Sequence, residues 1–207
     1  MTRPREQAAR LAERLEALGH EVVVSPLVEV EPLGDGPVDT DGFDWLVVTS
    51  RTAAVELARR RVGRLPKVAA IGPGTAEELA AHGIAADLVP AVSTQEGLLA
   101  ELPRPGGRVL FAGAEDARRL MVDELGVTFL PLYRTKALVP EVLPSGDLVL
   151  LASASAARAF AALGLDVAAV SIGPQTTAAA RAAGLRVVAE AATSDLDGLV
   201  AAVAAAV

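Results

Sequence analysis

The feature that most constrains the fold of this sequence is an internal repeat. Residues 71–84 recur as residues 172–185, with six of the fourteen positions identical at an offset of 101. Two more pairs of segments align at nearly the same offset, 93–98 with 194–199 and 46–50 with 149–153. Self-similarity at a fixed spacing indicates one structural unit used twice.

Each copy alternates short apolar runs with alanine-rich segments of helical spacing. Residues 46–49 precede a helical pattern over 52–60, and residues 68–71 precede another over 75–82. This alternation of strand and helix predicts parallel sheets with helices on both faces. The sequence therefore indicates an α/β fold.

Glycines and apolar periodicity predict where the helices end and which faces they bury. A glycine after a helical run favours a left-handed cap, which we expect at Gly19, Gly83, Gly126, Gly164 and Gly184. The first helix has an apolar stripe at helical spacing, and its members are Ala8, Leu11, Leu15 and Leu18. We expect this stripe to face a core.

The repeat also predicts a split domain. Residues 26–27 align with 131–132, and each pair precedes an extended stretch of alternating polar and apolar residues. Two such connections mean that the chain leaves one domain and later returns to it. The predicted divisions are a discontinuous α/β domain of residues 1–26 plus 140–207, an inserted α/β domain of residues 34–131, and linker strands at 27–33 and 132–139.

Composition excludes several classes of function. The 207 residues carry a net charge of −7, the opposite of what nucleic-acid and anionic-membrane binders show, so we expect neither partner. No cysteine and two isolated histidines leave little from which to build a metal site. No apolar segment resembles a signal peptide or a membrane span, which predicts a cytoplasmic protein. Neither a Gly-x-Gly-x-x-Gly motif nor a Walker lysine is present, which argues against nucleotide binding.

Four predicted strands end in small or hydroxyl residues at the start of a helix. Helix starts have unpaired N–H groups, so each turn can hold a carboxylate, and ligands collect at the carboxyl ends of strands in open α/β sheets. The alternative is that these residues are ordinary helix caps. The candidate binding residues are Thr49, Ser50, Gly72, Thr75, Ser153, Ser155, Gly173 and Thr176.

Taken in order, several motifs resemble those of the uroporphyrinogen-III synthase family. They cover nearly the whole chain, and they are Thr2-Arg3-Pro4 and residues 26–32, 43–50, 71–75, 132–135 and 172–176. The resemblance implies two flavodoxin-like parallel-sheet domains joined by a two-stranded linker, with the active site in the cleft between them. It also implies a monomer that needs no cofactor.

The family resemblance further implies a substrate and a reaction. The substrate is hydroxymethylbilane, a linear tetrapyrrole with eight carboxylates, which is closed with inversion of its last ring and loss of water. The steps are dehydration to an azafulvene cation and attack through a spiro intermediate. Tyr133, the only tyrosine in the chain, matches the family's candidate for assisting loss of the hydroxyl, and Arg3 matches a residue that binds a substrate carboxylate.

Two other functions remain open from the residues themselves. One is a non-catalytic clamp that binds a polycarboxylate. The other is a clamp for a smaller anion such as a sugar phosphate. For Tyr133 the alternative to catalysis is a packing role on the linker.

One departure from the family pattern concerns the discontinuous domain. The family has an apolar strand before its Thr-Arg motif, and the second repeat has one at residues 108–113, whereas here Thr2 and Arg3 follow Met1 directly. The first strand of a doubly wound sheet is usually interior. Three explanations stay open: a start placed too far downstream, a shortened chain, or a split domain that tolerates a gap in its sheet.

Overall fold

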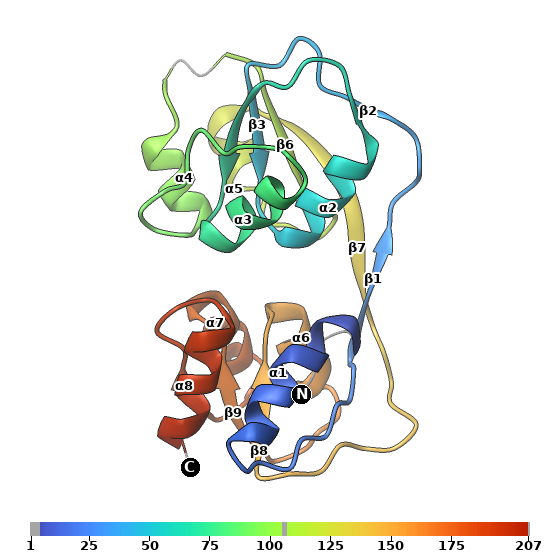
Figure 1. Ribbon diagram of the computed structural model, residues 1–207, viewed down its shortest axis with the longest axis vertical. Helices are drawn as coiled ribbons and strands as arrows, with labels where there is room; N and C mark the ends of the chain where they lie inside the picture. Colours follow the sequence, from blue (N-terminus) through green and yellow to red (C-terminus); the bar gives the residue numbers. More distant parts are fainter. Residues whose placement is uncertain (1–4, 105–106, 207) are drawn as a thin grey trace. The chain divides into compact units, whose positions relative to one another are not determined.

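The chain forms two compact α/β units. The computed structural model describes residues 5–104 and 107–206. Its contacts separate unit 1, made of Met1–Val30 and Lys136–Val207, from unit 2, which is the continuous segment Glu31–Thr135. In Figure 1 each unit has its strands inside and its helices outside. Among the described residues, no helix is both long and apolar enough to cross a bilayer.

Unit 2 is built on a sheet whose strand order is β1-β7-β6-β3-β5. Its strands are β1 (Val28–Pro32), β3 (Trp45–Val48), β5 (Lys67–Ala70), β6 (Val109–Ala114) and β7 (Thr128–Ala137), and its helices are α2 (Arg51–Arg60), α3 (Pro73–Ala81), α4 (Gln95–Glu101) and α5 (Leu120–Leu125). A separate parallel pair joins β2 (Val38–Asp39) and β4 (Arg61–Val62). Val47 and Phe111 pack with Leu98 of α4 and Met121 of α5, so these helices cover one face.

Unit 1 has a smaller parallel sheet in the order β10-β9-β8. Its strands are β8 (Leu148–Leu151), β9 (Ala168–Ser171) and β10 (Val187–Glu190), and its helices are α1 (Arg5–Ala17), α6 (Ala154–Ala161), α7 (Pro174–Ala182) and α8 (Leu196–Ala206). Leu151 packs with Phe160 of α6 on one face. Leu150 packs with Leu11 of α1 and Leu199 of α8 on the other, as the alternation of a strand requires.

The predicted helix ends are confirmed, and one predicted core position is wrong. All five glycines expected at left-handed caps have positive φ, between 60° and 88°. On α1, Ala8, Leu11 and Leu15 are buried, but Leu18 is 57% exposed. The helix ends at Ala17, so Leu18 lies beyond the part of the chain that the helical periodicity describes.

The linker consists of two antiparallel strands, β1 and β7. The Leu33 N–H donates to the Leu132 carbonyl and the Leu138 N–H donates to the Leu27 carbonyl, both at 2.8 Å. The division between the units falls inside both strands. Strand β7 begins before the predicted linker because its first half also pairs with β6 in the sheet of unit 2.

A charged pair also joins the two linker strands. Arg134 Nε of β7 donates to Glu31 Oε2 of β1 at 2.8 Å. An acidic side chain on an edge strand is usually solvated, but the opposite charge across the ladder gives Glu31 a partner.

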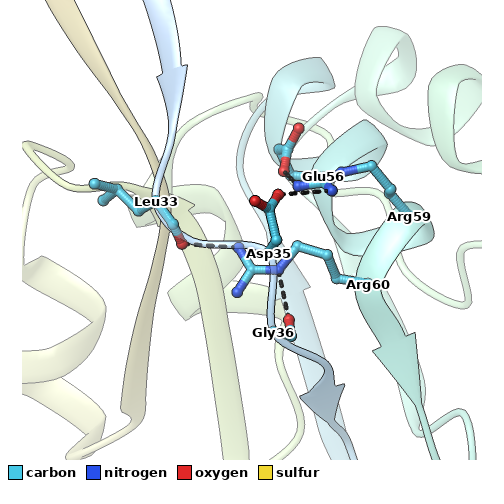
Figure 2. A network of polar contacts seen from close by, with 6 residues as sticks. All are labelled: Leu33, Asp35, Gly36, Glu56, Arg59 and Arg60. Carbon is cyan, nitrogen blue, oxygen red and sulfur yellow. Dashed lines mark hydrogen bonds and ion pairs between the residues drawn. The ribbon is translucent and has the colours of Figure 1, made fainter.

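A network on α2 holds the segment that follows β1 (Figure 2). Arg59 donates to the nearly buried carboxylate of Glu56 at 2.8 Å. Arg59 and Arg60 then donate to the segment at three acceptors, Asp35 Oδ1, Leu33 O and Gly36 O, at 2.9 to 3.0 Å. Buried charge is stable only when it is paired, so Glu56 fixes Arg59, and the two arginines fix the entry of the chain into unit 2.

The sheets of the two units, with five and three strands among the described residues, differ on one side of the strands that the repeat equates. In unit 2, β6 lies between β7 and β3. The repeat equates β3 with β8, but β8 is the edge of the three-stranded sheet formed by the described residues of unit 1. A cavity of about 740 Å³ lies next to β8, with Val22, Ser25 and Leu148 among its lining residues. The cavity therefore lies beside the strand that corresponds to β3, whose neighbour in unit 2 is β6.

An added apolar strand should stabilise unit 1. We expect an N-terminal extension that copies residues 108–113 to raise the melting temperature by about 5 °C, because it buries apolar area and pairs with backbone groups next to β8. Calorimetry of the extended and original chains measures the change. A glycine-serine extension of equal length is the control, and an equal melting temperature for all three proteins would contradict the expectation.

Candidate active site

The four predicted turns lie at the carboxyl ends of strands. In unit 2, β3 leads to Ser50, the N-cap of α2, and β5 leads to Gly72, the N-cap of α3. In unit 1, β8 leads to Ser153 and β9 leads to Gly173, the N-caps of α6 and α7. Because β3 pairs with β5 and β8 with β9 in parallel, each unit has two helix starts at one edge of its sheet.

Ser50 and Ser153 cap their helices in the same way. The Oγ of Ser50 accepts the Ala53 N–H at 3.0 Å, and the Oγ of Ser153 accepts the Ala156 N–H at 3.1 Å. Both serines are half-buried. The capping role that the sequence left open is thus present at both positions, and it leaves each hydroxyl hydrogen available for another acceptor.

The neighbouring candidates Thr49 and Ser155 are also half-buried, and each lies close to another residue of its own unit. Ser155 Oγ is 3.1 Å from Ser153 Oγ. Thr49 Oγ1 is 3.1 Å from the point where a Cβ on Gly113 would stand, so the absence of a side chain at the end of β6 makes room for it.

At Gly72 and Gly173 the close neighbour is a serine of the chain itself. A Cβ on Gly72 would stand 2.5 Å from Ser93 Oγ, and a Cβ on Gly173 would stand 2.6 Å from Ser194 Oγ. Both glycines are buried, and both serines are exposed. Sequence reasoning did not select these serines, although the repeat aligns them and gave the signal that could have found them.

The remaining binding candidates differ in accessibility. Thr75 and Thr176 lie in the first turns of α3 and α7 and are only 6% and 5% exposed. Their side chains point into the protein, so their turns offer backbone and serine groups rather than these hydroxyls. Arg3 lies outside the described residues.

Tyr133 lies on β7 beside the start of α2. It is 8% exposed, its hydroxyl oxygen is 2.9 Å from Ser50 Oγ, and its carbonyl accepts the Glu115 N–H at 2.8 Å. Burial raises the pKa of Tyr133 above its ordinary value, and the hydrogen bonds from Ser50 and Thr52 oppose that rise. The charge of Asp116 also raises this pKa. The sequence did not point to Thr52 or Asp116.

The loop that carries Asp116 is held by the start of α4. Arg118 donates to both carboxylate oxygens of Glu96, at 2.7 and 3.0 Å, and Gln95 donates to the Arg118 carbonyl at 3.0 Å. The hydrogen bond from Arg118 is the main cause that lowers the pKa of Glu96 to about 2. This two-point contact fixes the loop that follows β6.

The arrangement suits acid chemistry on an anionic ligand. A buried phenol with a fixed hydroxyl partner lies at the sheet edge where amide-rich helix starts also lie. Among the described residues there is no group of three or more His, Asp or Glu side chains placed to hold a metal ion.

The fold and the candidate site together define a duplicated, two-domain α/β protein with parallel sheets and a two-stranded linker. The sequence model of the family described as uroporphyrinogen-III synthase HemD matches residues 9–201. The chain belongs to the uroporphyrinogen-III synthase family, which confirms the resemblance seen in the motifs.

Two relatives agree with this assignment. The uroporphyrinogen-III synthase of Synechococcus elongatus is 30% identical, over 98% of this chain and 92% of that protein. A putative uroporphyrinogen-III synthase of Methanothermobacter thermautotrophicus is 35% identical, over 68% of this chain and 62% of that protein.

Two crystal structures show the same fold. A mutant uroporphyrinogen III synthase of Thermus thermophilus has a TM-score of 0.64 and 17% identity, covering 98% of this chain and 96% of that one. Uroporphyrinogen-III synthetase of Helicobacter pylori has a TM-score of 0.61 and 20% identity, covering 90% and 96%. The predicted two-domain α/β fold class is confirmed.

Replacing Gly97 by alanine should destabilise the turn that carries Ser93. An added Cβ would stand 2.0 Å from the backbone oxygen of Val92, which has no flexible end to move aside. We expect a loss of about 2 kcal/mol in the free energy of unfolding, measured by urea denaturation. Gly36→Ala is the control, because that glycine has open space around it. Equal stability of the two variants would show that the turn can shift without cost.

The Glu96–Arg118 pair should stabilise the protein at neutral pH and lose that effect in acid. The folded-state pKa of Glu96 is below the ordinary value of 4.5, so its contribution is full above about pH 4.5 and disappears as the pH falls towards 2. The pair is about half exposed, which limits the effect to about 0.5 kcal/mol. Denaturation of Glu96→Gln and wild type across this range should show the difference shrinking; a difference independent of pH would contradict it.

Proposed function

We propose that this chain is a uroporphyrinogen-III synthase. It closes hydroxymethylbilane to uroporphyrinogen III, inverts the last pyrrole ring and releases water. Membership of the family supports the reaction. The observation that carries the proposal is the Tyr133 hydroxyl, which lies 2.9 Å from Ser50 Oγ beside the start of α2.

Carboxylates of the substrate are proposed to bind at the helix starts of each unit. Each start has N–H groups without helical partners and the positive end of the helix dipole. The net charge of −7 means that attraction for a polyanion comes from such local groups and not from the protein as a whole. The proposed binding residues are Arg3, Thr49, Ser50, Gly72, Ser153, Ser155 and Gly173, to which we add Ser93 and Ser194, the exposed neighbours of Gly72 and Gly173. Thr75 and Thr176 belong to the same turns, but their side chains are buried, so they are left out of the proposed set.

Tyr133 is proposed to deliver the proton that starts the reaction. The proton passes from the phenol to the terminal hydroxyl oxygen, the carbon–oxygen bond breaks, and water leaves with the bonding electrons. The azafulvene cation that remains is attacked through a spiro intermediate. Loss of a proton from a pyrrole carbon restores aromaticity, and that proton returns to the phenolate, so the net change is loss of one water.

A phenol is a weak acid at neutral pH, and burial makes Tyr133 weaker still. The contribution of Tyr133 to the rate therefore depends on its position next to the leaving hydroxyl of the substrate. There the phenolate and the cation exist as separate charges only briefly. The proposed steps use no histidine, aspartate or glutamate side chain.

We further propose that the enzyme acts as a cytoplasmic monomer without a nucleic-acid or membrane partner. Sedimentation of the purified protein tests whether it is a monomer.

The test of the activity is the isomer of the product. The protein is incubated with hydroxymethylbilane made by an enzymatic source, and the oxidised porphyrins are separated. An excess of the type III isomer over the type I isomer, which forms spontaneously, supports the enzyme. Only type I product, together with binding of a uroporphyrin-type polycarboxylate, would support a non-catalytic clamp.

Tyr133→Phe should remove most of the activity and leave the fold intact. It deletes the only phenol in the chain, and we expect kcat to fall by about 100-fold, the usual contribution of a positioned general acid. Type III formation at saturating substrate measures the effect, and the melting temperature serves as the control. Full activity in this variant would transfer proton delivery to water or to the substrate's own carboxyl groups.

A further inference from the structure

The Ser50 hydroxyl makes two contacts that fix its direction. Its oxygen accepts the Ala53 N–H at 3.0 Å and lies 2.9 Å from the Tyr133 hydroxyl oxygen. A hydroxyl has one hydrogen to donate. With the Ala53 N–H on one lone pair, the Ser50 hydrogen can point at the Tyr133 oxygen, and this contact does not then use the Tyr133 hydrogen.

The other unit shows that capping alone does not produce this contact. Ser153 caps α6 with the same geometry as Ser50 caps α2, but the partner of its hydroxyl is Ser155. The repeat equates residues 26–27 with 131–132, which puts Val28 at the position of Tyr133. Val28 is buried in an apolar cluster. The serine–phenol pair is thus specific to unit 2.

We propose that Ser50 is a positioning residue for Tyr133, and that it orients the phenol and donates a hydrogen bond to the phenolate oxygen once the proton has left. This inference rests on the function proposed above. A phenolate oxygen only accepts hydrogen bonds, so a neighbour that stabilises it must be a donor.

Solvent does little to stabilise that phenolate. Tyr133 is 8% exposed, and a charge in such a place is costly unless a donor is held against it. Ser50 is such a donor, and its position is fixed by the helix start and not by the substrate. Thr52 is a second hydrogen-bonding neighbour of the phenol, but its hydroxyl is not the cap of α2.

Three substitutions at Ser50 separate its roles. Ser50→Ala removes both the cap and the donor. Ser50→Thr keeps both, because threonine also caps helices. Ser50→Gly removes the donor but weakens the helix start only slightly, because glycine is also a good N-cap, so it tests the donor even if the alanine variant folds poorly. Thr94→Ala is the matched control, since Thr94 caps α4 of the same unit by accepting the Gly97 N–H at 3.1 Å.

Two measurements are made on each variant. The first is kcat and KM for type III formation. The second is direct titration of the phenol, which is possible because the chain has one tyrosine. Biosynthetic replacement of tyrosine by a ring-fluorinated analogue labels Tyr133 alone and lowers the phenol pKa into a range where the protein stays folded, so that fluorine NMR reports ionisation.

The expected result is a decrease in kcat of about ten-fold in Ser50→Ala and Ser50→Gly, with KM changed less. The same two variants should have a higher phenol pKa than the wild type. Ser50→Thr should retain both values, and Thr94→Ala should change stability without moving the phenol titration.

The inference is overturned if Ser50→Ala and Ser50→Gly titrate like the wild type and keep its kcat. It is also overturned if Thr94→Ala raises the phenol pKa as much as they do. Failure of the proposed function appears differently. In that case Tyr133→Phe retains full activity or no type III isomer forms, while the titration still reports whether Ser50 donates to the phenol.

Discussion

Parallel backbone pairing is the constraint on which the candidate site depends. Strand β3 pairs with β5 on one side and with β6 on the other, and all four of its residues have partners in both ladders. The carboxyl ends of these strands are therefore level, and the turns that follow them lie at one edge of the sheet. The Glu115 N–H extends this pattern to β7, where it fixes the backbone of Tyr133.

The local features of the fold could be predicted from sequence, because their causes are local. Ser50 and Ser153 cap helices through N–H groups three residues away, and a glycine adopts the left-handed conformation just after α1, α3, α5, α6 and α7. Strand and helix alternation is likewise visible in a short window. These signals, together with the repeat, were sufficient for the fold class.

Several features of the site depend on distant residues, and there the sequence was insufficient. Thr75 and Thr176 have the spacing of ligand-binding hydroxyls, but packing within each unit buries them. Ser93 reaches Gly72 from a different loop, and the Ser50–Tyr133 contact joins residues 83 positions apart. Whether such pairs meet is decided by tertiary packing, on which periodicity and propensity carry no information.

The discontinuity of unit 1 has a consequence for the order of folding during translation. Unit 2 is one continuous segment, so it can fold as soon as Thr135 has left the ribosome. Helix α1 is made earlier, but its buried face packs against Leu150 and Leu199, which are among the later residues to be synthesised. During translation the apolar stripe of α1 therefore has no packing partners until β8 and then α8 have been synthesised.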